Sequence, residues 1–195
     1  QKYYDIEADL VTYGKAMANG FSVAAVAGKK EIMSLGSIEE EGRERLFLLS
    51  TTHGAEMCGL GAFIETISFM KEKDVVSHLW KYGEKLINLM NKLAKEYKIE
   101  KNFVASGIKC SPYYLTFDKN GQNCLGLRTL FSQEMIKNGV MMPWIALSYS
   151  HKEEELQITK AALEKTFEVY KKAVDDGYEK YLNGDIIKPV FRKYN

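Results

Sequence analysis

The chain of 195 residues has almost no excess of charge of either sign and no long apolar run. Lys and Arg together number 27 and Asp and Glu together number 26, which gives a formal net charge of +1. Nucleic-acid binders usually carry a strongly basic surface, so this balance argues against that class. The longest apolar stretches, such as residues 21–27, fall far short of the ~20 residues that a membrane-spanning helix needs. We therefore expect neither nucleic acid nor a membrane as a partner.

Cysteine is also scarce. The chain has three, widely spaced and without a C-x-x-C motif: Cys58, Cys110 and Cys124. The three histidines share no metal-ligand spacing either: His53, His78 and His151. Sparse cysteine is typical of a reducing compartment, and no zinc-ligand pattern is present. We expect a cytoplasmic protein without a metal site, with His78 and His151 in structural roles.

What the chain does contain is ordinary globular composition, with 46% apolar and 27% charged residues. At about 150 residues per domain, the length suggests one domain or two small ones. Apolar patterning predicts short strands, listed here in chain order: residues 9–13, 21–27, 46–50, around 104, 112–117 and 140–147. Pro143 in the last of these favours an edge position, because proline lacks the N–H that pairing requires. Residues 118–121 are predicted to form a hairpin turn.

Helices are predicted between these strands, the clearest at residues 75–98, where apolar residues recur at i, i+3 and i+4 and Asp74 is a candidate N-cap. The other helical segments are 30–35, 55–71, 126–138 and 150–181, the last opened by a capping box of Ser150 and Glu153. Aromatic residues such as Trp144 are interpreted as core or interface residues. Alternating strands and helices indicate an α/β or α+β class, and the charged residues 71–74 mark the best internal boundary.

Lys15 is the first candidate for chemistry. It follows a predicted strand and Gly14, and small residues follow it, so its side chain is expected to protrude into open space. A lysine amine with a lowered pKa can attack a carbonyl. The alternative reading of the same pattern is a surface lysine in a turn, since charged side chains are mostly exposed.

A second candidate is the hydroxyl-rich stretch STTHG at residues 50–54. Hydroxyl groups beside the first turn of a helix, whose N–H groups are unpaired, form a phosphate-binding site. The alternative is an ordinary helix N-cap, a role that Ser and Thr often fill. His53 lies within this cluster, and its role stays open.

These two stretches carry a resemblance to a known family. DLVTYGKAMANG at residues 9–20, followed by residues 24–33, resembles the lysine segment of the class III pyridoxal-phosphate aminotransferases. Residues 50–56 resemble the second phosphate-site motif of that family. Residues 139–155 and 188–195 resemble its branch that includes glutamate-1-semialdehyde aminomutase. The similarity extends over essentially the whole chain.

The resemblance implies a fold, a cofactor and roles for three residues. The fold would be α/β, the fold type I of pyridoxal-phosphate (PLP) transferases, normally a homodimer with its active site at the interface. Lys15 would hold pyridoxal 5'-phosphate as an internal aldimine and shuttle a proton between the substrate carbon and the cofactor. Thr51 would bind the cofactor phosphate, usually in the neighbouring subunit's site, with Thr52 as the alternative. The reaction would transfer an amino group between a small-molecule amine and a keto or aldehyde acceptor.

Family members are more than twice this length. Their glycine-rich phosphate loop, ring-stacking aromatic and pyridine-nitrogen aspartate normally precede the lysine. Asp5 and Asp9 lie too close to Lys15 to be that aspartate. The resemblance therefore implies the C-terminal half of the enzyme, with residues 1–72 as the end of the large cofactor-binding domain and 73–195 as the small C-terminal domain. The contrasting hypothesis is that the 195 residues alone are catalytically inert.

Two features bear on the substrate. Many class III aminotransferases carry a carboxylate-binding arginine before the last helix, and residues 144–150 contain none. This absence favours the aminomutase branch over ornithine- or GABA-type enzymes. Pro143, however, occupies the place of an acidic residue that aminomutases tend to carry. We therefore prefer an aminotransferase, with glutamate-1-semialdehyde 2,1-aminomutase as the alternative.

Overall fold

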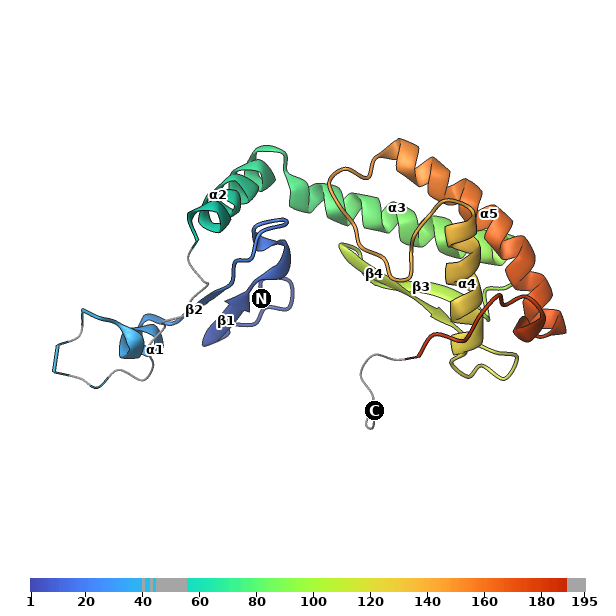
Figure 1. The fold of residues 1–195 in the computed structure, drawn as a ribbon, viewed down its shortest axis with the longest axis horizontal. Coiled ribbons are helices and arrows are strands. Elements are labelled where there is room, and N and C mark those ends of the chain that lie inside the picture. Colours follow the sequence, from blue (N-terminus) through green and yellow to red (C-terminus); the bar gives the residue numbers. More distant parts are fainter. Residues whose placement is uncertain (40, 43, 45–55, 189–195) are drawn as a thin grey trace. The chain divides into compact units, whose positions relative to one another are not determined.

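The computed structural model describes residues 1–39, 41, 42, 44 and 56–188. The chain divides into two compact units, an N-terminal unit of residues 1–74 and a C-terminal unit of residues 75–195. Figure 1 labels the elements of both units. Among the described residues, no helix combines the length and apolarity that crossing a membrane requires.

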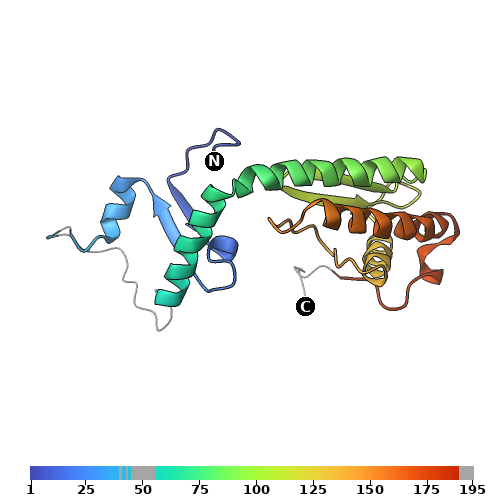
Figure 2. The same ribbon diagram turned by 90° about the horizontal axis from the view of Figure 1, so that it is seen from above.

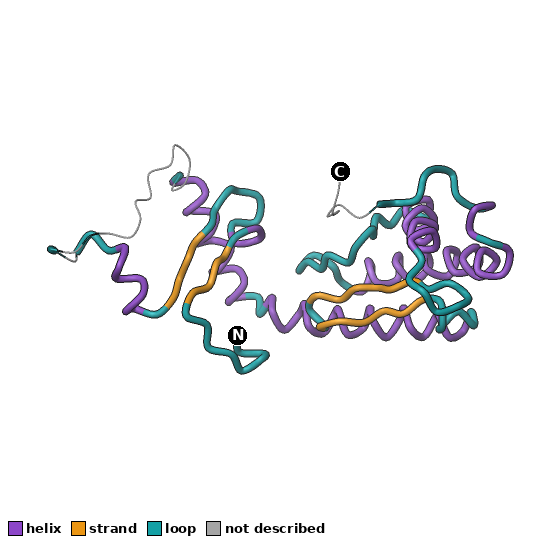
Figure 3. Tube along the Cα trace, turned by 90° about the horizontal axis from the view of Figure 1, so that it is seen from below, coloured by secondary structure: helices purple, strands orange, loops and turns teal. Residues whose placement is uncertain are grey.

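The N-terminal unit is built on a two-stranded antiparallel sheet. Strand β1 (Leu10–Tyr13) pairs with β2 (Ala25–Gly28), as the two orange strands of this unit show in Figure 3. The short helix α1 (Lys30–Met33) follows, and the longer helix α2 (Met57–Glu72) ends the unit. The predicted strand at 9–13 and helices at 30–35 and 55–71 are thus confirmed, and β2 begins later than predicted. The strand predicted at 46–50 lies outside the described residues.

Helix α2 is apolar, yet it is little buried within its own unit. Its side chains include Met57, Ile64 and Phe69, which are 82%, 62% and 45% exposed. Gly59 is its one buried residue, because the helix approaches the chain before β2 closely at this point. A Cβ added to Gly59 would lie 2.8 Å from the Cγ2 atom of Val23. Glycine therefore permits the contact that holds α2 on this unit.

The C-terminal unit packs three helices around a β-hairpin (Figures 1 and 2). Helix α3 (Val75–Glu96) leads into β3 (Phe103–Ile108) and β4 (Ser111–Thr116), which pair antiparallel. Helices α4 (Leu125–Lys137) and α5 (Glu153–Asp176) complete the unit. The prediction held for these helices and strands to within a few residues at most ends, because their apolar spacing is regular.

An aromatic cluster forms the core of this unit. Phe103 of β3 stacks on Tyr114 of β4, with ring centroids 5.6 Å apart. Phe131 of α4 lies 4.8 Å from Phe103, and Phe167 of α5 lies 5.0 Å from it. Burial alternates along β4, so one face of the hairpin meets the helices. Together with the aliphatic residues around it, this cluster forms the apolar core that stabilises the unit.

The strand predicted at residues 140–147 is wrong, because this segment forms an irregular loop. Its carbonyl groups bind side chains instead of a neighbouring strand. The hydroxyl of Tyr114 donates to the carbonyl oxygens of Met142 and Pro143 at 3.2 and 2.9 Å, and Nη2 of Arg128 donates to that of Pro143 at 3.3 Å. Because Pro143 has no N–H group, it could not pair fully in a strand, and these contacts satisfy the backbone carbonyl groups instead.

Three smaller differences concern turns and caps. The capping box of α5 uses Lys152 instead of Ser150, since the backbone N–H of Lys152 donates to Oε2 of Glu155 at 2.8 Å. The helix ends at Asp176, five residues before the predicted end, where Gly177 takes a φ of +94°. Residues 118–121 form a turn as predicted, and an antiparallel bridge between Phe117 and Asn123 closes it beyond the end of β4. The strands of the hairpin are joined by residues 109–110.

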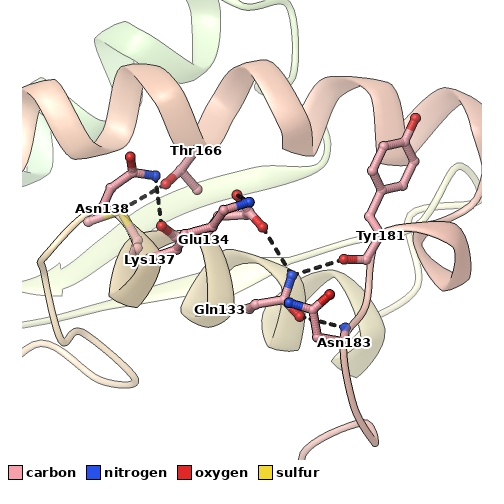
Figure 4. A network of polar contacts seen from close by, with 8 residues as sticks. Gln133, Glu134, Lys137, Asn138, Thr166, Tyr181 and Asn183 are labelled. Atoms are coloured by element: carbon pink, nitrogen blue, oxygen red, sulfur yellow. Dashed lines mark hydrogen bonds and ion pairs between the residues drawn. The ribbon is translucent and has the colours of Figure 1, made fainter.

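The segment after α5 is tied back to α4 by one glutamine (Figure 4). Nε2 of Gln133 donates to the carbonyl oxygen of Tyr181 at 2.9 Å, and the backbone N–H of Asn183 donates to Oε1 of Gln133 at 2.8 Å. Nε2 of Gln133 also donates to Glu134, whose side chain is almost fully buried. The side-chain amide of Gln133 thus satisfies one backbone carbonyl and one backbone N–H group of this segment, which no helix or strand would otherwise pair.

Candidate active site

Lys15 stands directly after β1, at the first position of a single 3₁₀ turn. Gly14 before it is extended, with φ −178° and ψ −156°, and Lys15 then takes a left-handed φ of +54°. The chain therefore leaves the extended conformation of β1 at Lys15. This geometry places the lysine side chain outside the β1–β2 ladder, as the sequence predicted.

The left-handed conformation of Lys15 carries a cost. For a residue with a Cβ atom, this region costs about 1–2 kcal/mol. Asn19 and Gly20 are also left-handed, with φ of +44° and +123°. Three backbone hydrogen bonds hold the turns, and the first runs from Met17 N–H to the Gly14 carbonyl at 3.2 Å. Ala18, only 2% exposed, anchors the loop to its unit. Strain of this kind gathers at functional sites when the surrounding structure holds it.

The amine of Lys15 is available. Its side chain is exposed, and among the described residues it has no hydrogen-bond or ion-pair partner. Lys29, on the same hairpin, differs in this respect because its Nζ lies 2.8 Å from Oδ1 of Asp9. A primary amine without a partner can act as a nucleophile toward a carbonyl compound. Asp9 is thus engaged with Lys29.

The other predicted site residues lie outside the described residues. These are Thr51, Thr52 and His53, so their distance from Lys15 is not part of the described geometry. Of the predicted cofactor residues, the described part of the chain holds Lys15 alone.

The two histidines of the C-terminal unit take part in hydrogen bonds of that unit. Nε2 of His78 donates to the carbonyl oxygen of His151 at 2.8 Å, and Nδ1 of His151 accepts from the backbone N–H of Ser148 at 3.2 Å. These contacts fit the structural interpretation of both residues. Within the described ranges, no group of three or more His, Cys, Asp and Glu side chains could hold a metal ion.

The sequence analysis did not single out a cleft in the C-terminal unit. The cleft has a volume of about 550 Å³ and lies between α3, the start of α5 and the loop at residues 139–147. Tyr82 and Glu155 line it, and so does Trp144, which is 68% exposed and not a core residue. Because Tyr82 follows the apolar period of α3, the pattern alone gave no reason to separate it from the core.

With this geometry in hand, the chain can be compared with known proteins. The profile of the aminotransferase class-III family matches residues 1–174. The 3-aminobutyryl-CoA aminotransferase of Cloacimonas acidaminovorans is 31% identical over 176 residues, covering 88% of this chain and 40% of that protein. The glutamate-1-semialdehyde 2,1-aminomutase of Fusobacterium nucleatum is 29% identical over 179 residues, covering 86% and 40%. The chain thus spans about 40% of the length of these relatives.

Solved structures show the same likeness in the fold. The FumI protein of Sphingopyxis sp. MTA144, in its PLP internal aldimine form, superposes with a TM-score of 0.74 at 17% identity, covering 90% of this chain and 40% of that one. An omega-transaminase from Sphaerobacter thermophilus gives 0.73 at 17% identity, covering 88% and 41%. The prediction of fold type I is confirmed by this likeness. Since the family profile extends over most of the chain, the chain belongs to the class III aminotransferase family.

Proposed function

We propose that this chain is part of a PLP-dependent class III aminotransferase in which Lys15 is the catalytic residue. The observation that carries the proposal is the amine of Lys15, which has no partner among the described residues and is held by a strained turn that follows β1 and Gly14. The match of the family profile to residues 1–174 supports it. In this proposal residues 1–72 end the large cofactor-binding domain and residues 73–195 form the small C-terminal domain.

The residues around Lys15 fit pyridoxal phosphate. An aldehyde cofactor needs an amine that is accessible and not engaged in an ion pair, and within the described part of the chain Lys15 meets both conditions. No described atom lies within 4 Å of a Cβ added to Gly20, so the loop is open at this residue. When bound, pyridoxal phosphate supplies an aldehyde that condenses with amines and a ring that accepts an electron pair from the substrate carbon.

Two tasks then fall to Lys15. Its Nζ would hold pyridoxal phosphate, which would fix the cofactor's position relative to β1. With a substrate amine in its place, the same Nζ would be free to accept a proton from the substrate carbon and to donate one in return. The left-handed turn serves both tasks because it directs the side chain away from the strand while keeping its Cα fixed.

Further parts of the proposal concern residues 50–54 and assembly. Thr51, with Thr52 as the alternative, would bind the cofactor phosphate beside a helix N-terminus, where N–H groups attract anions. In this proposal the enzyme is a cytoplasmic homodimer, and the threonine acts in the neighbouring subunit's site. Its substrates are a small-molecule amine and a keto or aldehyde acceptor.

A second candidate is a glutamate-1-semialdehyde 2,1-aminomutase, which the likeness to the Fusobacterium nucleatum enzyme favours. The two candidates differ in whether the amino group leaves the first substrate. Incubation of the holoenzyme with a ¹⁵N-labelled amine and an unlabelled acceptor separates them. A labelled amine formed from the acceptor supports transfer between molecules, whereas an isomer of the amine, formed while the acceptor is not consumed, supports the aminomutase.

The role of Lys15 is tested by replacement in the intact enzyme that carries this chain. We expect Lys15→Ala to abolish turnover and Lys15→Arg to do the same, because arginine keeps the charge but does not deprotonate. Lys30→Ala is the matched control, since Lys30 is an exposed lysine of α1 in the same unit. Near-normal turnover of Lys15→Ala would overturn the assignment. The 195 residues alone, at about 40% of the relatives' length, are expected to show no turnover.

A further inference from the structure

The cleft of the C-terminal unit has a buried apolar floor and an exposed apolar mouth. Tyr82, Leu86 and Met142 form the floor, at 7%, 3% and 6% exposure. Met141 and Trp144 stand at the mouth, at 83% and 68% exposure. The volume of about 550 Å³ lies within the range typical of small-molecule sites, ~300–1,000 Å³. Size and lining therefore suit an organic molecule better than a single ion.

The hydroxyl of Tyr82 is a polar group without a partner on the floor of this cleft. No described residue hydrogen-bonds to it, although the side chain is more than nine-tenths buried. Among the described residues, no fully buried side-chain nitrogen or oxygen lacks a partner, so this hydroxyl must reach open space. The cleft that Tyr82 lines supplies that space. A hydroxyl that opens into a cleft can hydrogen-bond to a ligand that takes the place of water there.

The ring of Tyr82 is fixed in place by its neighbours. It stacks on His78 at a centroid distance of 6.0 Å and lies 5.7 Å from the ring of His151. Burial, and after it the charges of Glu155 and Glu153, raise the pKa of Tyr82, so the hydroxyl keeps its proton near neutral pH. The group is thus both a donor and an acceptor at a defined position.

Glu155 gives the cleft a negative charge. Among the described residues that line the cleft, it is the only Asp, Glu, Lys or Arg. Hydrogen bonding from the backbone N–H of Lys152 lowers the pKa of Glu155, which keeps the carboxylate ionised. Within the described part of the chain, Glu155 makes no ion pair. The hydroxyl of Thr159, also in the lining, is already used, because it donates to the Glu155 carbonyl at 2.7 Å.

We propose that this cleft binds an organic ammonium ion, a protonated amine with an apolar body. The ammonium group pairs with the Glu155 carboxylate and donates to the Tyr82 hydroxyl, and the apolar body contacts Leu86, Met142 and the indole of Trp144. An aromatic ring beside the cation adds further attraction. A carboxylate or phosphate ligand would face Glu155 with like charge and is disfavoured. The inference concerns binding alone and does not depend on the chemistry of Lys15.

Three probes with a similar phenylalkyl body, but with end groups of different charge, test which charge the cleft prefers in a ligand. They are 2-phenylethylamine, the neutral 2-phenylethanol and the anionic 3-phenylpropionate, each titrated into the full 195-residue chain without cofactor. Binding is followed by tryptophan fluorescence and by calorimetry. We expect the amine to bind at least ~10-fold more tightly than the alcohol, since a hydrogen bond to a charged group is worth that much, and the acid to bind most weakly. Equal binding of all three, or tighter binding of the acid, would overturn the proposal.

Two variants then locate the amine. Tyr82→Phe removes only the hydroxyl, and Glu155→Gln removes the charge but keeps an acceptor for the Lys152 N–H. Each variant is expected to bind the amine about 5- to 10-fold more weakly than the unaltered chain does. Glu155→Gln is expected to leave the binding of 2-phenylethanol less affected, because the alcohol carries no charge. Glu154→Gln is the matched control, because Glu154 is exposed, adjacent in sequence and absent from the lining.

Circular dichroism of each variant checks that α5 is intact. If a variant does not fold, the probe series on the unaltered chain still decides the proposal. Amine binding unchanged in both Tyr82→Phe and Glu155→Gln would show that the cleft is not its site.

Discussion

Replacing Gly83 by alanine is predicted to destabilise the C-terminal unit, although alanine has the higher helix propensity of the two residues. Gly83 lies in the middle of α3, where alanine should be better by about 1 kcal/mol. A Cβ at this position, however, would lie 1.7 Å from the Lys109 carbonyl oxygen and 2.9 Å from Cδ1 of Leu147. The first neighbour is backbone of the turn that joins β3 and β4, so it cannot rotate away as a side chain could.

The expected magnitude follows from these two opposing terms. Forcing an extra methyl group into a well-packed position typically costs about 1–3 kcal/mol, and a backbone contact this short belongs at the upper end or beyond. After subtracting the propensity gain, we expect Gly83→Ala to lower the free energy of unfolding by about 2 kcal/mol. The Tm should fall by roughly 5–10 °C for a unit of this size.

Urea denaturation followed by tryptophan fluorescence measures the effect, because both tryptophans, Trp80 and Trp144, lie in this unit. Asn88→Ala is the control, since Asn88 is an exposed residue of the same helix, and its replacement should stabilise by a few tenths of a kcal/mol. A Gly83→Ala variant as stable as the Asn88→Ala variant would refute the close packing of α3 on the hairpin turn.

Three further predictions concern other contacts. Gln133→Ala should free residues 181–183 from α4, which accelerates amide hydrogen exchange there and lowers stability by about 1–2 kcal/mol; unchanged exchange would contradict the anchoring role. Burial raises the pKa of Tyr170 far above its ordinary value of 10.0, so the stability of the unit should fall as pH rises above about 10, and Tyr170→Phe should flatten that fall in urea midpoints measured at pH 9 to 11. Equal slopes for both proteins would refute the linkage. Lys15→Gly should relieve the left-handed strain and slow hydrogen exchange of the loop while cofactor binding is lost; faster exchange would argue against strain.

The sequence predicted the C-terminal unit well because its signals are local. The spacing of apolar residues along α3 and the alternation along β4 are periodic, and each period identifies one kind of element. The loop at 140–147 was mistaken for a strand because its composition is apolar. Its structure is determined by contacts that are distant in sequence. The side chains of Tyr114 and Arg128 donate hydrogen bonds to the carbonyl oxygen of Pro143.

The candidate sites depended on different kinds of information. The residue pattern alone allowed two interpretations of Lys15, a reactive amine or a surface lysine in a turn. The family resemblance, and not the pattern, assigned it a catalytic role. The left-handed turn was not foreseen, because a lysine gives no local signal for positive φ. The cleft around Tyr82 and Glu155 joins residues more than 70 positions apart, and no local pattern brings such residues together.

Reductive trapping tests the central claim most directly. The intact protein that carries this chain is incubated with pyridoxal phosphate, reduced with borohydride, digested and mapped by mass spectrometry, with Lys15→Ala treated in parallel. The account predicts one stoichiometric adduct, on the peptide that contains Lys15, and its loss in the variant. An adduct centred on Lys29 or Lys30, or one of equal yield in the variant, would contradict it.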